Sequence, residues 1–184
     1  MAKRVLVTGG AGFIGSHVVD RLVKDSYAVR IIDDLSTGKL DNIRRHVSSG
    51  KVDFVKGDIR DASLVKKIVE DIDVVIHLAA VTSVPLSVKN PDLTFDVNLL
   101  GTLNLLRSSI EKRVDRFVFA SSCAVNGDPE FLPVNEEAPT SPISPYAESK
   151  LIVERYCLGF NERKLLESVV LRFFNVYGLS LIHI

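Results

Sequence analysis

Short apolar runs alternate with amphipathic segments along almost the whole chain. Runs rich in Val, Ile, Leu and Phe predict six buried strands, at residues 5–7, 28–32, 52–55, 73–80, 116–120 and 168–173. Between these runs, apolar residues recur at helical spacing, as in the series Leu99, Leu103, Leu106 and Ile110. Helices are predicted to begin near residues 13, 40, 62, 91 and 145, the third of them with Asp61 as its N-cap.

This alternation predicts an α/β fold with a doubly wound parallel sheet, that is, a Rossmann fold. Right-handed crossovers then give the strand order 3-2-1-4-5-6. Ligands of such sheets bind beyond the carboxyl ends of the strands. The polar clusters of this chain fall at those ends, at residues 9–15, Asp33, Asp58, residues 79–80, residues 121–122 and Asn175. Their convergence predicts one ligand site along that edge of the sheet.

Composition and charge are typical of a soluble enzyme domain. The 184 residues suffice for one α/β domain. The 23 basic residues balance 23 acidic ones, so no excess of positive charge indicates a nucleic-acid-binding surface. No apolar run has the length of a membrane span, and Val5 leads straight into a glycine-rich segment, unlike a signal peptide. Cys123 and Cys157 form no CxxC pair, so neither a metal site nor a disulfide is expected. We therefore expect a cytoplasmic protein with reduced thiols.

The first strand runs into three glycines spaced three residues apart, Gly9, Gly12 and Gly15, which open a helix. In a dinucleotide fold the first glycine permits a tight turn, and the second lets the backbone approach the diphosphate. The third lets the helix pack closely on the strand. A helix beginning near Phe13 then directs free N–H groups and the positive end of its dipole at the diphosphate. The segment predicts a dinucleotide site.

An acidic residue ends the second strand, where a ribose-binding carboxylate belongs in this fold. Asp33 follows the apolar run at residues 28–32. A carboxylate there accepts both ribose hydroxyls of NAD and repels the additional phosphate of NADP. Arg30 and Lys39 lie nearby in the sequence, but neither directly follows the acid. We therefore expect NAD as the cofactor.

Tyr146 and Lys150 lie four residues apart at the beginning of the last predicted helix, hence on one face of it. A free phenol has a pKa of about 10. A neighbouring Lys⁺ favours the phenolate, so Lys150 is expected to lower the pKa of Tyr146 toward the range of a general base. Ser122, at the end of the fifth strand, is placed to hydrogen-bond the substrate oxygen whose proton moves. The three residues predict acid/base catalysis beside the dinucleotide.

In combination, these motifs resemble those of the extended short-chain dehydrogenase/reductases, and most of all their UDP-glucose 4-epimerase branch. The matching segments are TGGAGFIGSH at 8–17, DDLSTG at 33–38, GDIRD at 57–61, HLAA at 77–80, NLLGTLNLL at 98–106, SS at 121–122, SPYAESK at 144–150 and RFFNVYG at 172–178. The resemblance covers nearly the whole chain as far as Gly178. It implies a Rossmann domain over residues 1–178, NAD as the cofactor and a UDP-sugar as the substrate.

The resemblance also assigns roles to single residues. It implies Tyr146 as the catalytic acid/base, Lys150 as the group that binds the nicotinamide ribose and tunes Tyr146, and Ser122 as the holder of the reacting sugar hydroxyl. The implied cofactor-binding residues are Gly9, Gly12, Phe13, Ile14, Gly15, Asp33, Asp34, Ser36, Thr37, Gly38, Asp58, Ile59, Leu78, Ala79, Ala80, Asn98, Tyr146 and Lys150, with Asp58 and Ile59 against the adenine. The implied substrate-binding residues are Ser122, Tyr146 and Asn175.

The implied reaction is a redox cycle on bound NAD with no net redox change. Tyr146 removes the proton from the sugar 4-OH while hydride leaves C4, and hydride later returns to the opposite face of the 4-keto sugar. Resembling dehydratases carry Asp-Glu directly after the residue equivalent to Ser122, and decarboxylases usually carry Glu there. Here Cys123, Ala124 and Val125 follow. Epimerisation is therefore favoured over elimination.

Several alternatives remain open from the sequence. A nucleotide-sugar dehydrogenase, reductase or dehydratase would belong to the same family, and a non-catalytic NAD-binding module would have no need of a tuned phenol. The sequence specifies neither the sugar nor the oligomeric state, although relatives commonly form homodimers through the helices around Leu99 and Tyr146. Two residues depart from the family pattern. Asn126 replaces the usual tyrosine of a Val-Tyr-Gly turn, and Thr82 stands where some epimerases have a cofactor-contacting lysine.

Two further side chains near the site are expected to be structural, and the last six residues are expected not to belong to the natural protein. His77 is expected to be a hydrogen-bonded structural residue, and Cys123 a small residue in the wall of the site. Residues 179–184 match the translation of a transposon end used as a sequencing adapter, and we interpret them as a non-native tail. Members of the family continue into a C-terminal region that closes over the nucleotide-sugar. The chain alone is therefore expected to bind NAD weakly and to turn over no sugar.

Overall fold

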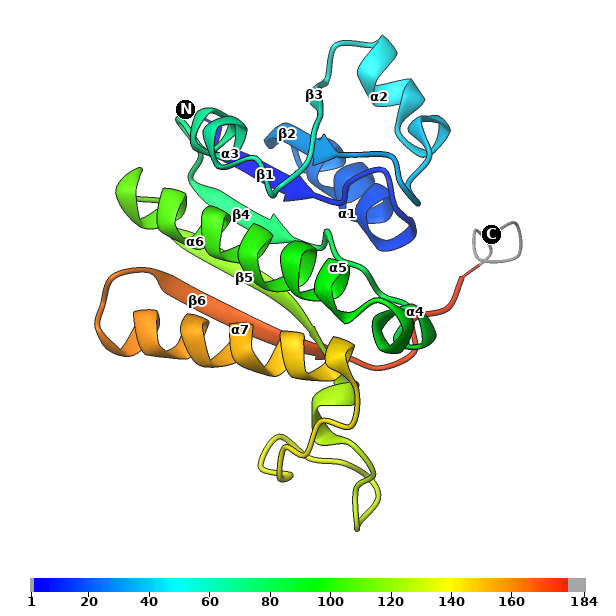
Figure 1. Ribbon diagram of the computed structural model, residues 1–184. Coiled ribbons are helices and arrows are strands. Elements are labelled where there is room, and N and C mark those ends of the chain that lie inside the picture. Colours follow the sequence, from blue (N-terminus) through cyan, green and yellow to red (C-terminus); the bar gives the residue numbers. More distant parts are fainter. Residues whose placement is uncertain (1, 179–184) are drawn as a thin grey trace.

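The structure, a computed structural model, describes residues 2–178, and six parallel strands form one sheet in it (Figure 1). The strands are β1 (Arg4–Thr8), β2 (Ala28–Asp33), β3 (Val52–Lys56), β4 (Val74–His77), β5 (Arg116–Ser122) and β6 (Glu167–Phe173). Their order in the sheet is β3-β2-β1-β4-β5-β6. The predicted strand order and the doubly wound α/β fold are therefore confirmed. The predicted non-native tail, residues 179–184, lies outside the described residues.

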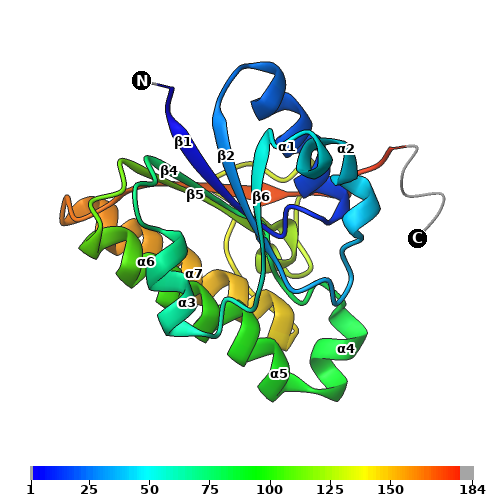
Figure 2. The same cartoon turned by 90° about the horizontal axis from the view of Figure 1, so that it is seen from above.

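Helices cover both faces of the sheet. They are α1 (Phe13–Lys24), α2 (Arg44–Ser48), α3 (Ala62–Ile68), α4 (Val84–Lys89), α5 (Pro91–Phe95), α6 (Thr102–Glu111) and α7 (Pro145–Glu162), with the 3₁₀ turns η1 (Leu40–Asn42) and η3 (Cys123–Asn126) and the π-helical segment η2 (Asp96–Gly101). Figure 2 shows α1 and α2 on one face and α3, α6 and α7 on the other. Among residues 2–178, no helix is long and apolar enough to cross a membrane.

The alternation of side chains along the strands divides the core into two layers. In β1, Val5 and Val7 belong to the layer beneath α1, whereas Leu6 belongs to the layer beneath α3, α6 and α7. At the edge strand β6, Val170 packs into the second layer. Val169 and Leu171 point the other way and are 36% and 40% exposed. The face of β6 opposite α7 is thus only partly covered within the described chain.

Three predicted boundaries need correction. The predicted strand at 73–80 ends at His77, which pairs with Thr8, the last residue of β1, and the backbone N–H of Ala79 then donates to the Thr8 hydroxyl (3.1 Å). The single helix predicted from residue 91 is three consecutive segments, α5, η2 and α6, with a π-helical stretch in the middle. The helix predicted near residue 40 is a 3₁₀ turn followed by the short α2.

Capping residues account for two other helices. Asp61 caps α3 as predicted, since its carboxylate accepts from the backbone N–H groups of Ser63 and Leu64. The sequence did not predict α4, which begins with a Ser83 cap that accepts from Leu86 N–H (3.3 Å) and has a proline in its first turn. A six-residue helix is too short to show a recognisable apolar period.

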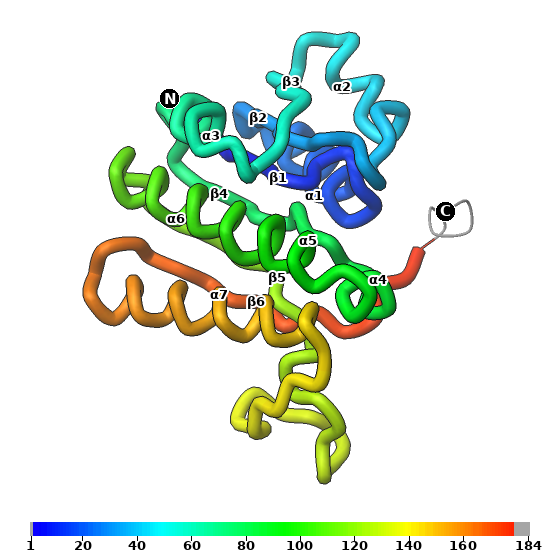
Figure 3. The backbone as a smooth tube through the Cα atoms, viewed as in Figure 1, coloured from blue at the N-terminus to red at the C-terminus, as the bar shows by residue number. Residues whose placement is uncertain are grey.

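A long loop, residues 127–143, projects from the sheet between η3 and α7 (Figure 3). Its base is closed by Asn126, whose side-chain amide donates to the carbonyls of Ala138 (3.2 Å) and Pro139 (3.1 Å). A backbone hydrogen bond from Ser141 to Val125 (3.0 Å) adds to this closure. The departure from the Val-Tyr-Gly pattern therefore anchors the loop that joins Ser122 to Tyr146.

Candidate NAD and acid/base site

The glycine turn after β1 is shaped by close backbone contacts. Gly9 has a φ of +69°, and a Cβ there would lie 2.8 Å from the backbone N of Ala79. A Cβ on Gly15 would lie 2.1 Å from the carbonyl oxygen of Gly9. Both positions therefore require glycine, the first for its left-handed conformation and the second for the close packing of α1 on the turn.

The middle glycine and the first turn of α1 leave room for an anion. A Cβ on Gly12 would meet only the Gly9 carbonyl, at 3.3 Å. Helix α1 begins at Phe13 with no side-chain cap and no acidic residue in its first turn. Its leading N–H groups and the positive end of its dipole are thus not neutralised by a side chain. These features fit a diphosphate placed over Gly12, as the sequence predicted.

Asp33 ends β2 and lies directly beneath the glycine turn. Its two carboxylate oxygens accept one backbone N–H each, from Ala11 (2.9 Å) and from Leu35 (2.9 Å). Burial raises the pKa of Asp33, and the two backbone hydrogen bonds oppose this rise. Each oxygen keeps a second lone pair, so the carboxylate can still accept hydroxyl groups. The geometry fits the predicted ribose contact and ties its position to the glycine turn.

Asp34, a predicted cofactor-binding residue, holds the following turn by accepting from Ser36. Of the two predicted adenine contacts, Asp58 pairs with Arg60. By contrast, the side chain of Ile59 is 4% exposed and belongs to the core. Its carbonyl accepts from Asn104 (3.1 Å). Only the backbone N–H of Ile59 is thus available to a ligand.

Ser122 and Tyr146 come together at the carboxyl end of β5. The Ser122 hydroxyl interacts with the Tyr146 phenol, and this interaction lowers the pKa of Tyr146. Burial raises the same pKa by more, and the nearby Cys123 adds to the rise. The prediction that Lys150 lowers the pKa of Tyr146 is therefore corrected, because the lowering contact in the structure comes from Ser122.

Lys150 lies one turn further along α7 and is 4% exposed. Its ammonium donates to the carbonyl of Ala120 (2.8 Å) and lies 4.9 Å from the ring centroid of Phe119 and 5.9 Å from that of Tyr146. Burial lowers the pKa of Lys150 to about 8. An ammonium with three N–H groups and one carbonyl partner has donors to spare for a ligand.

Asn98 lies in the π-helical segment η2 and is 2% exposed. Its side-chain oxygen accepts from Val81 N–H (2.8 Å), and its amide nitrogen donates to the Val81 carbonyl (3.0 Å) and to the Ser149 hydroxyl (3.2 Å). Both amide hydrogens are thus used within the protein. Asn98 was predicted as a cofactor-binding residue, and here it joins the loop after β4 to the residue before Lys150.

Glu154 was missed by the sequence analysis. It lies one turn after Lys150 on α7, is 2% exposed and accepts from the Ser121 hydroxyl. It also pairs with both arms of the Arg172 guanidinium (Oε1 to Nε 3.0 Å, Oε2 to Nη2 2.8 Å). Ser121 and Arg172 are register partners on β5 and β6. One carboxylate thus fixes both strands directly before Ser122 and before the chain that leads to Asn175.

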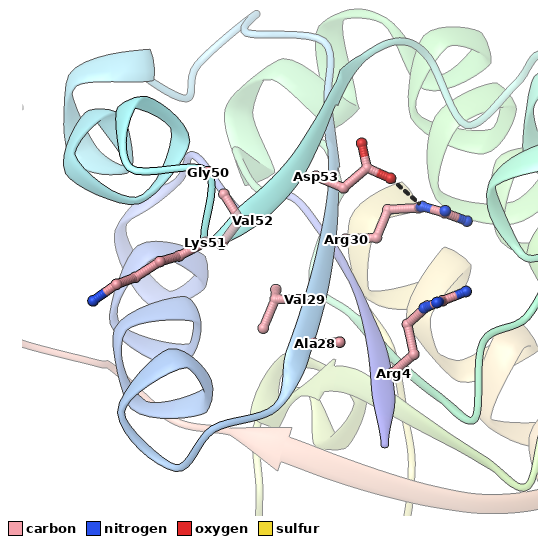
Figure 4. Close-up of a pocket in the computed structure, with 8 residues that line it drawn as sticks. All are labelled: Arg4, Ala28, Val29, Arg30, Gly50, Lys51, Val52 and Asp53. Carbon is pink, nitrogen blue, oxygen red and sulfur yellow. Dashed lines mark hydrogen bonds and ion pairs between the residues drawn. The ribbon is translucent and has the colours of Figure 1, made fainter. Parts of the chain in front are cut away.

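A hollow elsewhere carries charges but not the predicted site residues (Figure 4). It lies at the amino ends of β1 to β3, near Arg4, Arg30, Lys51 and Asp53, with a volume of about 310 Å³. Arg30 is already paired with Asp53 (2.7 Å) and with the carbonyls of residues 68 and 70. Among residues 2–178, no group of three or more His, Cys, Asp or Glu side chains is placed to hold a metal ion.

The remaining predicted residues also lie along the carboxyl edge. Gly38 approaches the Asp33 carboxylate, where an added Cβ would lie 2.9 Å from its oxygen. Leu78, Ala79 and Ala80 follow β4 and are partly exposed, and Asn175 follows β6 and is exposed. The fold therefore assembles the glycine turn, Asp33 and the Ser122–Tyr146–Lys150 group at one edge of the sheet.

Residues 5–181 match the family described as the NAD dependent epimerase/dehydratase family. The chain belongs to this family. It is 48% identical over 176 residues to a putative UDP-glucose 4-epimerase of Methanocaldococcus jannaschii, an alignment that covers 95% of this chain and 56% of the relative. The chain thus spans about half the length of the curated relatives it matches.

Solved members of the epimerase/dehydratase family have the same fold. The UDP-N-acetylglucosamine 4-epimerase of Methanobrevibacter ruminantium, in complex with UDP-N-acetylmuramic acid, superposes with a TM-score of 0.91 at 41% identity, covering 96% of this chain and 56% of that one. The UDP-glucose 4-epimerase of Thermus thermophilus, in complex with NAD, gives a TM-score of 0.87 at 42% identity, covering 95% and 56%.

Proposed function

We propose that this chain is the cofactor-binding and catalytic part of an NAD-dependent nucleotide-sugar 4-epimerase, of the UDP-glucose/UDP-galactose type. The observation that carries the proposal is the convergence of Ser122, Tyr146 and Lys150 at the carboxyl end of β5, with the Lys150 ammonium 5.9 Å from the Tyr146 ring, beside the glycine turn and Asp33. Relatives with UDP-sugar epimerase names support the UDP-sugar as substrate. NAD, when bound, supplies the hydride acceptor and donor for the sugar C4.

Each of the three residues has a role that follows from its position. Tyr146 exchanges a proton with the 4-hydroxyl of the sugar, and Ser122 donates its hydroxyl hydrogen to the same oxygen. Lys150 has spare N–H groups with which it would bind the nicotinamide ribose. Gly12 and the first turn of α1 hold the diphosphate, and Asp33 holds the adenosine ribose. Asn175 is expected to contact the nucleotide-sugar.

The lining next to Ser122 favours epimerisation over elimination of water. Elimination needs an additional proton donor and acceptor close to the reacting carbons. Cys123, Ala124 and Val125 form a 3₁₀ turn after Ser122, and the first carboxylate beyond them, Asp128, lies in the projecting loop. No acidic side chain therefore adjoins Ser122 in this part of the sequence.

A second copy of the chain is the expected partner. Apolar side chains remain exposed on two helical segments of the described chain, namely Leu100 (53%) on η2 and Leu158 (51%) on α7. A homodimer formed through these helices buries them. Sedimentation of the full-length enzyme then gives a dimer, and Leu158→Lys gives a monomer. The free thiols of Cys123 and Cys157 are consistent with a cytosolic enzyme.

A chimera provides the direct test of turnover. Residues 1–178 are joined to the remaining C-terminal part of the Methanocaldococcus jannaschii relative and assayed on UDP-galactose. The expected result is interconversion with UDP-glucose that falls at least about 100-fold in Tyr146→Phe. Tyr156→Phe, on the same helix, serves as the control and keeps its activity. A chimera that binds NAD but does not turn over UDP-galactose would support a binding module instead, and full activity of Tyr146→Phe would contradict the role of Tyr146.

A further inference from the structure

A buried chain of polar groups centres on His77, which is 1% exposed at the end of β4. On one side, Nδ1 lies 2.6 Å from the hydroxyl of Thr8 on β1. On the other side, Nε2 lies 2.8 Å from the hydroxyl of Thr102 at the beginning of α6. Thr8 and Thr102 are fully buried. Every polar atom in this chain must therefore find its partner inside the protein.

Counting lone pairs assigns the proton on the imidazole. The Thr8 hydroxyl oxygen accepts from the backbone N–H of Ala79 (3.1 Å) and from that of Leu78 (3.2 Å), which it shares with the Thr8 carbonyl. These two hydrogen bonds fill its two lone pairs, so Thr8 has only its hydrogen left for Nδ1. Thr102 donates its own hydrogen to the carbonyl of Asn98 (2.6 Å) and can only accept from Nε2. The imidazole is thus neutral, with its proton on Nε2.

The surroundings keep the ring in this state. The ring centroids of Phe117 and Phe119 lie 5.9 and 5.8 Å from that of His77, and the Phe119 ring is stacked against it. Burial and the charge of Lys150 lower the pKa of His77 to about 3. Within the described chain, Lys150 is the one charged group that acts on the pKa of His77, and the other faces of the ring meet hydroxyl groups and aromatic carbon.

The two ends of this chain of polar groups lie at different parts of the cofactor site. Thr8 directly precedes Gly9, and the Ala79 amide that it binds is the atom that a Cβ on Gly9 would meet. At the other end, Thr102 holds Asn98, whose side chain joins Val81 to Ser149, the neighbour of Lys150. A continuous set of hydrogen bonds therefore runs from the glycine turn to α7.

We propose that His77 is a positioning residue of the cofactor site. It couples the glycine turn after β1 to η2, and through Asn98 to the helix that carries Tyr146 and Lys150. The inference rests on the proposed function, because the parts that it aligns are those that hold the two ends of a dinucleotide. Thr8 and Thr102 determine which nitrogen of the His77 ring carries the proton. This tautomer keeps the glycine turn aligned with the helix that carries Tyr146 and Lys150.

The experiment uses the 184-residue chain labelled with ¹⁵N-histidine. Long-range ¹H–¹⁵N spectra report which ring nitrogen carries the proton, and the His77 signals are identified by their loss in His77→Gln. In the wild type, we expect the proton on Nε2 and an unprotonated Nδ1. Thr102→Ser keeps this pattern. Thr102→Val removes the acceptor while conserving shape, and it shifts the ring signals and the amide signals of Gly9 and Ala79.

The same pair of variants is titrated with NAD⁺. We expect Thr102→Ser to bind like the wild type and Thr102→Val to bind roughly tenfold more weakly, as for a buried donor left without a partner. A proton on Nδ1 in the wild type overturns the inference, and so does equal NAD⁺ affinity of the two variants. A wild-type chain that does not bind NAD⁺ contradicts the proposed function. In that case the amide signals of Gly9 and Ala79 test the inference. They must change position in Thr102→Val and remain unchanged in Thr102→Ser.

Discussion

The carboxylate of Glu154 on α7 holds the guanidinium of Arg172 on β6 in a two-armed ion pair. The Glu154 side chain is 3% exposed and that of Arg172 27%. Glu154 also accepts from Ser121, so it joins the helix of Lys150 to β5 and β6, the two strands that end beside Ser122 and before Asn175. A buried carboxylate in this setting is tolerated because each of its oxygens has a charged or hydroxyl donor.

Removing one member of this pair should destabilise the protein. We expect Glu154→Gln to lower the free energy of unfolding by about 2–4 kcal/mol, since Arg172 is left half-buried without its counter-charge. The double variant Glu154→Gln/Arg172→Gln should recover part of the loss. Asp115→Asn breaks the exposed pair with Lys3 and should cost less than about 1 kcal/mol. Equal losses of unfolding free energy for Glu154→Gln and Asp115→Asn in urea denaturation would contradict this account.

Lys150 should give the stability of the protein a pH dependence above neutrality. Its pKa is lowered to about 8 when folded, so the folded state binds its proton less tightly than the unfolded state does. The cost of the buried charge is therefore fully present below about pH 8 and disappears toward about pH 10.5. Lys150→Met should be more stable at pH 7, by up to about 3 kcal/mol, and this advantage should shrink as the pH rises. A stability difference between Lys150→Met and the wild type that does not change with pH would show that the ammonium is not desolvated.

His77 should act in the acidic range. The pKa of His77 is lowered to about 3 in the folded state, so near pH 6.5 this imidazole binds a proton in the unfolded state and stays unprotonated in the folded state. Stability then falls as the pH drops from about 6.5 to 4.5, with a slope of about 1.4 kcal/mol per pH unit. His77→Gln has no such proton to take up, and its stability curve should be flatter by that slope. Parallel curves for the two proteins would argue against a neutral His77.

Ser122 should be the group that lowers the pKa of Tyr146. Ser122→Ala removes the interaction of this hydroxyl with the phenol, so the pKa of Tyr146, already raised by burial, should rise further. Ring-labelled tyrosine followed by NMR across an alkaline titration measures this shift. Ser121→Ala is the neighbouring control, since its hydroxyl binds Glu154 instead, and it should leave the Tyr146 curve in place. A shift of equal size in both variants would point to a general loosening of β5.

Much of the fold and of the site was predictable because it depends on local signals. The apolar runs specified all six strands and their order, and Gly9, Gly15 and Asp33 occupy the places that a dinucleotide fold requires. His77 was expected to be a hydrogen-bonded structural residue, and its contacts with Thr8 and Thr102 confirm this.

What the sequence did not predict depends on contacts between distant residues. Glu154 looks like any acidic residue of an amphipathic helix until the register of β5 and β6 places Ser121 beside Arg172. The engagement of Asn98 with Val81 and Ser149 depends on the π-helical stretch, for which the regular spacing of Leu99, Leu103 and Leu106 gave no sign. The pKa of Tyr146 was misjudged because burial, which sequence spacing does not measure, has the larger effect.

The central claim is that residues 2–178 form a dinucleotide site whose preference for NAD⁺ over NADP⁺ is set by Asp33. Titration of the chain with NAD⁺ and with NADP⁺ tests this claim most directly. We predict that NAD⁺ binds, if weakly, and that NADP⁺ binds at least about tenfold more weakly, because the Asp33 carboxylate repels the additional phosphate. Asp33→Asn should weaken NAD⁺ binding and narrow the difference between the two cofactors. Binding of neither cofactor, or tighter binding of NADP⁺ by the wild-type chain, would contradict the account.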